Sequence, residues 1–314
     1  MRWLRWLFPG LSLWGCTSLT PYEEVWRNLP QNRRLELEGQ RVHVEVVGEG
    51  SPLLLLHGFG GSSWSWREVI PELSRIRTVV ALDLNGFGWT ERPREPESYS
   101  LLGQESLVLK VADRLGFEQF DLMGHSYGGA IAIFLAARHP QRVRRLVLLD
   151  SALPSYGQER RRRVFGLRKL ASWYVRTVGV TKPVVRRGLQ AAFYDDSKVT
   201  EDLVQGYLER LRVEGLEEAF FGLTAPQSGA RDPEVRFEQV QAKTLVLWGE
   251  EDRLISPAFG EKLASKLVEA RFEKLPACGH NPMEECPDRF LQVAVPFLEE
   301  ESGGSEVRAT GSGQ

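Results

Sequence analysis

The chain has 314 residues, of which 42% are hydrophobic and 26% are charged, with a formal net charge of -2 at pH 7. This length allows two domains or one large α/β domain with an insertion, and either can bury a full core. The 3 cysteines are too few for a small fold held by disulfides. With 40 Lys and Arg against 42 Asp and Glu, the chain lacks the basic field of nucleic-acid-binding proteins. Function must therefore come from a local site, and no nucleic-acid partner is expected.

The first sixteen residues differ from the rest of the chain. Arg2 and Arg5 precede an apolar stretch at residues 6–14 and a cysteine, Cys16, which is the pattern of a secretory signal. The stretch is about half as long as the roughly 20 residues of a membrane-spanning helix. Residues 13–16 resemble the lipobox of bacterial lipoproteins, in which the cysteine carries the lipid. An exported, lipid-anchored protein is therefore expected, and a cytoplasmic protein with an amphipathic leader is the alternative.

Short apolar runs predict a mostly parallel sheet. Residues 34–38 and 41–47 alternate apolar and polar side chains, which indicates an antiparallel hairpin. Later runs are almost continuously apolar, as expected of strands buried on both faces. Helical stretches at residues 101–115 and 127–138 separate some of them, so the sequence predicts a doubly wound α/β sheet. The later strand candidates are residues 52–56, 78–82, 120–123, 146–149, 244–248 and 270–275.

The alternation of strands and helices stops at residues 151–235. This segment has helical periodicity, and it is predicted to form a cap over the carboxyl edge of the sheet, where ligands bind in such folds. Its aromatic pairs Trp173-Tyr174 and Phe220-Phe221 are interpreted as cap core, with an acyl pocket as the alternative. The predicted organisation is a leader at residues 1–16, a core at 20–150 and 236–298, this cap, and a disordered tail at 299–314.

Residues 158–190 contain ten lysines and arginines and one acid. Together with a lipidated Cys16, such a basic face could bind anionic headgroups at a membrane surface. A solvated face of the cap is the simpler interpretation.

Gly124-His125-Ser126-Tyr127-Gly128 follows the predicted strand at residues 120–123 and opens a helix. In that context G-x-S-x-G predicts a nucleophile elbow, in which the two glycines remove side chains that would collide at a sharp turn. Ser126 is therefore the predicted nucleophile.

His280 is predicted to be the general base, because a serine hydroxyl needs a base to accept its proton. It lies in a loop after the last predicted strand, on the carboxyl side of the sheet. Each of the other four histidines has a structural explanation, and the one beside the nucleophile is expected to point away from it. These four are His43, His57, His125 and His139.

Asp252 follows the predicted strand at residues 244–248 and is predicted to orient the imidazole of His280. Its neighbours Glu250 and Glu251 are rivals for this role. Asp150, which follows the preceding strand, is the more serious rival.

Two backbone N–H groups are predicted to bind the oxyanion. One belongs to Tyr127, directly after the nucleophile, and the other belongs to Phe59 in a glycine-rich loop after an early strand. Losing one such donor raises the barrier by about 2.7–4 kcal/mol, so this loop is expected to be functional.

Together these segments resemble the capped α/β-hydrolase superfamily, from about residue 35 to residue 298. In that family the residues that match Ser126, Asp252 and His280 form a catalytic triad. The resemblance also implies that residues 83–90 shape a loop near the site and that Trp66 is a packing residue. The matching segments are His57-Gly58-Phe59-Gly60, residues 83–90 and 124–129, Trp248-Gly249-Glu250-Glu251-Asp252 and Gly279-His280.

The residue at position 126 separates some subfamilies. Similar epoxide hydrolases and haloalkane dehalogenases use an aspartate where this chain has Ser126, so their chemistry is disfavoured. Carbon–carbon bond hydrolases of aromatic degradation resemble this chain in length and cap position, but they usually carry asparagine where His125 stands. Cofactor-free haloperoxidases share the triad.

The preferred prediction is an esterase or lipase that cleaves a small-molecule or lipid ester through an acyl-enzyme intermediate. A carbon–carbon bond hydrolase and a cofactor-free haloperoxidase are alternatives on the same triad. A ligand-binding or receptor protein with this fold and negligible turnover is the alternative of another class.

No cofactor or metal is expected, because no Cys/His cluster has ligand spacing and no dinucleotide or phosphate loop is present. Cys278 and Cys286 flank His280 and are expected to be free thiols. A disulfide between them is the alternative if the domain is exported. Nothing in the sequence fixes an oligomeric state.

Overall fold

The computed structural model describes residues 19–153, 179–224 and 234–300. The predicted leader with Cys16, residues 158–178 of the basic segment, Trp173-Tyr174 and the tail from residue 301 lie outside these ranges. No helix within the described ranges is long and apolar enough to cross a membrane.

Eight strands in the described residues form one sheet in the order β1-β2-β4-β3-β5-β6-β7-β8. β1 pairs antiparallel with β2, and β2 pairs antiparallel with β4, whereas all other neighbours are parallel. The predicted mostly parallel α/β sheet with an antiparallel entry hairpin is therefore confirmed. The strands are β1 (Arg34–Leu37), β2 (Gln40–Val47), β3 (Pro52–Leu56), β4 (Thr78–Leu82), β5 (Phe120–His125), β6 (Val143–Leu149), β7 (Lys243–Gly249) and β8 (Ala270–Leu275).

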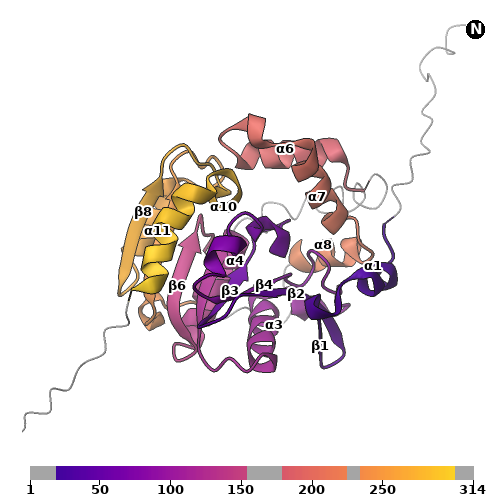
Figure 1. The fold of residues 1–314 in the computed structure, drawn as a ribbon, viewed down its shortest axis with the longest axis horizontal. Coiled ribbons are helices and arrows are strands. Elements are labelled where there is room, and N and C mark those ends of the chain that lie inside the picture. The colour runs from indigo at the N-terminus through magenta and orange to yellow at the C-terminus, as the bar shows by residue number, and fades with distance from the viewer. Residues whose placement is uncertain (1–18, 154–178, 225–233, 301–314) are drawn as a thin grey trace, which may run out of the picture.

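Helices cover both faces of this sheet (Figure 1). The α-helices outside the insertion are α1 (Tyr22–Asn28), α2 (Ile70–Leu73), α3 (Leu101–Arg114), α4 (Tyr127–Arg138), α9 (Pro257–Ala264), α10 (Pro282–Glu285) and α11 (Pro287–Glu299). Short 3-10 helices are η1 (Gln31–Arg33), η2 (Ser63–Trp66), η3 (Pro96–Tyr99), η4 (Asp196–Lys198) and η5 (Phe237–Gln239).

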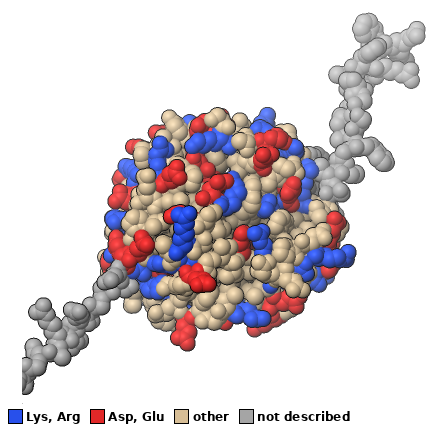
Figure 2. Space-filling view, viewed as in Figure 1, with Lys and Arg blue, Asp and Glu red and all other residues tan. Residues whose placement is uncertain are grey.

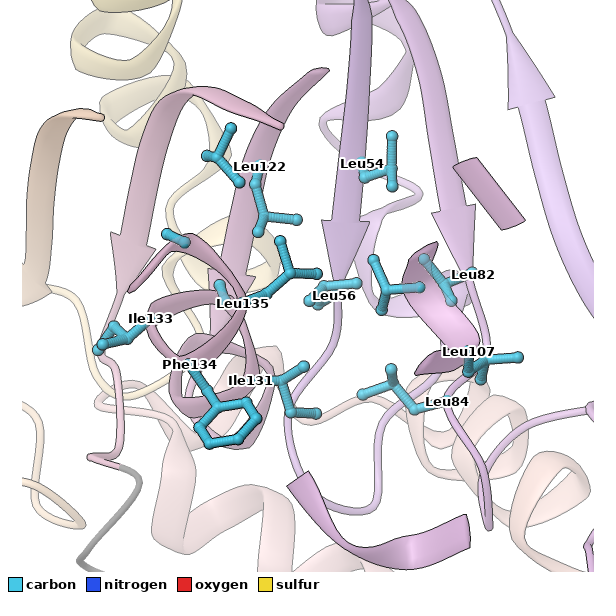
Figure 3. Close-up of a cluster of buried hydrophobic side chains, with 14 of the residues drawn as sticks. Leu54, Leu56, Leu82, Leu84, Leu107, Leu122, Ile131, Ile133, Phe134 and Leu135 are labelled. Atoms are coloured by element: carbon cyan, nitrogen blue, oxygen red, sulfur yellow. The ribbon is translucent and has the colours of Figure 1, made fainter. Parts of the chain in front are cut away.

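Alternate residues of the central strands enter two different cores, because successive side chains of a strand point to opposite faces. Leu54 and Leu56 of β3 pack in the cluster that contains α3 and α4. Leu53 and Leu55 pack in the cluster that contains α2 and α11. Figure 3 shows part of the first cluster, with leucines of the sheet gathered beside the apolar side chains of α4. Burial on both faces explains why these strands have continuous apolar sequences.

Three helices are described between β6 and β7, where the sequence predicts an inserted helical segment. They are α6 (Lys182–Ala192), α7 (Glu201–Leu211) and α8 (Leu216–Thr224). α6 and α7 share a small hydrophobic cluster of their own, whereas α8 contributes Ala219 and Leu223 to the main core. Phe221 of α8 is 36% exposed, so the expectation that it belongs to a buried cap core is wrong.

The two ends of the described chain are tied to the fold. Thr20 forms a parallel bridge with Val213, directly after α7, so the N-terminal segment lies beside the inserted helices. At the other end, Glu300 forms an ion pair with Lys243. The folded region therefore extends two residues into the predicted tail. On the face shown in Figure 2, acidic and basic side chains are interspersed, as expected of a nearly neutral chain.

Replacing Leu54 with alanine is expected to lower the free energy of unfolding by about 2–5 kcal/mol, because the close-packed core cannot collapse around the cavity. Leu54 is fully buried, whereas Val268 is 70% exposed. Val268→Ala is the matched control and is expected to change the free energy of unfolding by less than about 0.5 kcal/mol. Urea unfolding measures both, and equal losses in the two variants would contradict this account of the core.

Candidate active site

Ser126 stands at a strained turn between β5 and α4. Its backbone has φ 49° and ψ -111°, a left-handed conformation that costs about 1–3 kcal/mol for a residue with a side chain. Its N–H donates to the carbonyl of Leu149 in β6 at 2.9 Å. A Cβ on Gly124 would lie 2.5 Å from the carbonyl oxygen of Gly128, and one on Gly128 would lie 2.3 Å from that of Leu56. Both glycines are therefore required, and the predicted elbow is present.

The structure brings Ser126, His280 and Asp252 together in a hydrogen-bonded chain. Ser126 Oγ lies 2.9 Å from His280 Nε2, and His280 Nδ1 lies 2.7 Å from Asp252 Oδ2. This is the geometry in which a histidine can remove the serine proton while a carboxylate fixes the ring. The three residues come from the turns after β5, β8 and β7, at the carboxyl edge of the sheet.

Asp252 is favoured in its charged form. Its Oδ1 accepts hydrogen bonds from the backbone N–H groups of Leu254 and Ile255 at 2.7 and 3.0 Å. Burial by itself would raise the pKa of Asp252, but the hydrogen bond to His280 and these two N–H donors outweigh it and hold that pKa below the usual carboxyl value. Asp252 can therefore stabilise an imidazolium beside it.

The rivals of Asp252 lie elsewhere. Glu250 and Glu251 are exposed to solvent. Asp150 is fully buried beside Asp252, and its Oδ1 accepts a hydrogen bond from the N–H of Gly249 at 2.9 Å. In the described part of the chain, Asp150, Asp252 and His280 are grouped closely enough to hold a cation. Asp252 and His280 already bind each other. The expectation that the reaction uses no metal stays a prediction.

The glycine-rich loop after β3 lies against the nucleophile. A Cβ on Gly58 would lie 3.2 Å from the Cβ of Ser126, so the backbone of Phe59 follows directly beside the site. Tyr127 is the first residue of α4, and N–H groups at a helix N-terminus favour a negative charge. Both predicted oxyanion residues therefore flank Ser126. The ring of Phe59 is 61% exposed and packs edge-to-face on Phe87.

The expectation that His125 points away from the site is wrong. Its Nε2 lies 2.7 Å from the backbone carbonyl of His280. Burial and the neighbouring His280 lower the pKa of His125 to about 3, so the neutral ring donates its Nε2–H to that carbonyl. His125 therefore helps to hold the backbone of the loop that carries His280. This role depends on side-chain packing between distant segments, and no sequence pattern signals it.

A disulfide closes the loop that carries His280. Cys278 and Cys286 are bonded, with their Cα atoms 6.0 Å apart, so the expectation of free thiols is wrong. Both side chains are buried. The N–H of Gly279 also donates to Glu285 at 2.6 Å, and the N–H of His280 donates to the carbonyl of Ala192 in α6 at 2.6 Å. The histidine is thus held by its own loop and by the inserted helices.

A second Ser-His-Asp cluster lies in the core, but it is no proton relay. Ser63 Oγ and Asp83 Oδ2 both approach the same ring nitrogen, Nδ1 of His43, at 3.3 and 2.9 Å. A relay needs the hydroxyl and the carboxylate on opposite nitrogens. Asp83 also accepts the N–H groups of Ser63 and Trp89 at 2.6 and 2.8 Å, so this cluster fastens η2 and the motif at residues 83–90 to β2.

His57 and His139 also have structural partners. His57 Nε2 accepts the N–H of Leu84 at 3.1 Å, and its Nδ1 lies 2.7 Å from the carbonyl of Gly58. His139 Nε2 lies 3.2 Å from Glu105. Trp66 is fully buried, as the packing role predicts.

Replacing both Cys278 and Cys286 with alanine is expected to lower the free energy of unfolding by about 2–3 kcal/mol, because the unfolded chain regains the freedom of the closed loop. Urea unfolding of the oxidised protein measures the loss. Dithiothreitol should destabilise the wild type and leave the double variant unchanged. A wild type that is indifferent to the reductant would argue against the bond.

Asp83→Asn is expected to destabilise the protein at neutral pH. It is also expected to make the free energy of unfolding less dependent on pH in the acid range. Burial alone would raise the pKa of Asp83, but His43 and the backbone donors lower it overall. A carboxyl whose pKa is lower in the folded state stabilises above its unfolded pKa and loses that contribution as the pH falls. The difference in unfolding free energy between wild type and variant should therefore shrink from about pH 5 to about pH 2. A difference independent of pH would refute this assignment.

The comparisons with known proteins agree with this geometry. The family model described as alpha/beta hydrolase fold matches residues 51–287. The 2-hydroxymuconate semialdehyde hydrolase of Pseudomonas sp. (strain CF600) is 33% identical over 287 residues, which cover 87% of this chain and 97% of that protein. The 2-hydroxy-6-oxo-6-phenylhexa-2,4-dienoate hydrolase of Comamonas testosteroni is 28% identical over 263 residues, which cover 82% and 91%.

Solved structures extend the similarity. A meta-cleavage product hydrolase from Pseudomonas fluorescens IP01 superimposes with a TM-score of 0.68 at 27% identity, covering 85% of this chain and 97% of the other. An esterase from Thermogutta terrifontis has a TM-score of 0.69 at 23% identity, covering 84% and 97%, and at that identity it supports the fold alone. With the matching family model, these relatives and the triad geometry, the chain belongs to the alpha/beta hydrolase fold family, within its capped superfamily.

Proposed function

We propose that this protein is a serine-dependent hydrolase of a carbon–carbon bond, with ring-opened 6-oxo-dienoates (meta-cleavage products), which carry an aldehyde or a ketone at C6, as its substrate class. The observation that carries the proposal is the 33% identity to a 2-hydroxymuconate semialdehyde hydrolase along 97% of that relative. The comparisons thus favour the carbon–carbon alternative over the ester cleavage that the sequence had suggested first.

The proposed reaction begins at the C6 carbonyl, which is an aldehyde or a ketone. Ser126 Oγ attacks this carbon while His280 Nε2 accepts the hydroxyl proton, and Asp252 stabilises the imidazolium. The N–H groups of Phe59 and Tyr127 hold the oxyanion of the tetrahedral intermediate. These steps are common to ester and carbon–carbon hydrolysis, because they need only an electrophilic carbonyl beside Ser126.

Cleavage then needs a carbon leaving group that can accept an electron pair. In a 2-hydroxy-6-oxo-2,4-dienoate that has tautomerised to the 2-keto form, the 2-hydroxyl proton has moved to C5. The C5–C6 bond then breaks, and its electron pair is delocalised through the C3–C4 double bond onto the 2-keto oxygen. His280 returns its proton to the leaving fragment, and the acyl group stays on Ser126. Water activated by His280 then releases the acid and restores the hydroxyl.

The inserted helices are proposed to cap this site. The carbonyl of Ala192 in α6 binds the backbone of His280, and Tyr207 of α7 donates to Glu284 in α10 at 2.5 Å. Tyr207 also lies 3.1 Å from Ser65 of η2. α6 and α7 are therefore anchored beside the triad, on the same side as α10 in Figure 1. A cover there would keep water away until the acyl-enzyme has formed.

A carboxylic ester is the second candidate, and His125 favours it. The carbon–carbon hydrolases to which the chain was likened usually carry asparagine before the serine, whereas here a buried imidazole occupies that place and binds the His280 carbonyl. An ester needs no electron sink in its leaving group, so it places fewer demands on the side chains around Ser126.

Export is proposed as well, on the support of one feature. Disulfides persist in oxidising compartments outside the cytoplasm, and Cys278 and Cys286 are bonded beside the site. A lipid anchor at Cys16 and contact with a membrane surface stay proposals that rest on the leader sequence.

The test compares two substrate families on the same protein. Purified chain is assayed with 2-hydroxymuconate semialdehyde and its 6-phenyl ketone analogue, and with p-nitrophenyl esters of increasing acyl length. The dienoates are expected to give the larger kcat/KM, and Ser126→Ala is expected to lower kcat by on the order of 10⁴-fold or more.

A fluorophosphonate probe supplies the control, because it labels an activated serine whatever the natural substrate. Labelling at Ser126 with ester turnover alone would replace the proposed substrate class by the second candidate. No labelling and no turnover of either family would leave the ligand-binding alternative and overturn the enzyme assignment.

A further inference from the structure

Asp150 is a second buried acid beside the triad, and the proposed reaction leaves it without a role. It directly follows β6 and has a left-handed backbone conformation with φ 43°. Its side chain is fully buried, and Oδ1 accepts the N–H of Gly249 at 2.9 Å. Oδ2 is also buried, and no donor from the described residues reaches it. Buried polar atoms are rarely left without a partner, so the state of this oxygen needs an explanation.

Another carboxyl lies close to Asp150. One oxygen of Asp150, one oxygen of Asp252 and one ring nitrogen of His280 all lie within 4.8 Å of one another. The side chains of Asp150 and Asp252 are both buried and come from the ends of neighbouring strands, β6 and β7. Two buried carboxylates this close to each other repel, so one of such a pair keeps a proton.

The donors around the two acids decide which one is charged. Asp252 accepts three hydrogen bonds, one from the ring of His280 and two from the backbone N–H groups of Leu254 and Ile255. From the residues that the structure describes, Asp150 accepts one, from Gly249. Since each donor favours the charged form, the negative charge belongs on Asp252 and the proton on Asp150.

We propose that Asp150 is a positioning residue, held as a neutral carboxylic acid whose O–H donates a hydrogen bond to the carboxylate of Asp252. This bond gives the buried Oδ2 its partner and fixes Asp252 against His280. Burial and the neighbouring Asp252 raise the pKa of Asp150 well above its usual value, and Glu285 adds to the shift. Asp150 touches no substrate and acts through Asp252, so the inference rests on the proposed function only through the triad.

The protonation state is tested without any substrate. Infrared spectra of the wild type and of Asp150→Asn are recorded near neutral pH and subtracted. The wild type should show the C=O stretch of a protonated carboxylic acid that the variant lacks. Asp195→Asn, at a solvent-exposed aspartate on the inserted segment, is the matched control and should remove no such band. Spectra in which Asp150→Asn removes no protonated-acid band would overturn the proposal.

The positioning role is tested by the rate at which a fluorophosphonate labels Ser126. An asparagine tolerates the left-handed backbone, accepts from Gly249 and still donates to Asp252, so Asp150→Asn should label within about threefold of the wild-type rate. Asp150→Ala loses the donor, so Ser126 in this variant should be labelled on the order of tenfold or more slowly than in the wild type. Slow labelling of Asp150→Asn would mean that the charge of Asp150 matters, and would refute a neutral donor.

These outcomes separate the two proposals. If dienoates are not turned over while labelling and the infrared band behave as described, the substrate class is wrong and the role of Asp150 stands. Should Asp150→Ala fail to fold, the infrared comparison with Asp150→Asn still decides the protonation state.

Discussion

The backbone turn at Ser126 is the constraint on which the rest of the site depends. A residue with a side chain holds a left-handed conformation there only if its surroundings leave no alternative. β5 is buried along its whole length between β3 and β6, and α4 is buried from Gly128 to Ala137. Buried apolar packing therefore lies directly before and after the strained residue. The cores on both faces of the sheet stabilise the elbow, and the hydroxyl is held where the loop of Gly58 and the imidazole of His280 can reach it.

The position of His280 depends on contacts from several parts of the chain. Its carbonyl accepts from the ring of His125 and its N–H donates to Ala192 of α6, while the disulfide closes its loop. The contact from α6 links the backbone of His280 directly to the inserted helices. A displacement of α6 would move the backbone of the residue that must meet Ser126 at 2.9 Å.

The sequence predicts the parts of this site that follow from topology. Parallel strands end at the same edge of a sheet, so Ser126, Asp252 and His280 could be assigned from the strands that precede them. The roles of His125 and Asp150 could not be predicted, because they depend on which buried atoms face each other across strands far apart in the chain. The disulfide could not be predicted for the same reason. Its cysteines are eight positions apart in the sequence, but the distance between their Cα atoms depends on how the loop folds. The start of β6 was missed by three residues, because Val143 joins the sheet through its pairing with Phe120.

The same topology explains why two acids meet behind one histidine. β6 and β7 are neighbours, and each ends in a turn that carries an aspartate, Asp150 or Asp252. Strand order brings both within reach of His280, but it does not decide which one carries the charge. That decision belongs to the turn after β7, whose N–H groups at Leu254 and Ile255 point at Asp252. The number of local hydrogen-bond donors therefore selects Asp252 as the charged acid of the triad. Asp150, which has fewer donors, keeps its proton and can donate a hydrogen bond to Asp252.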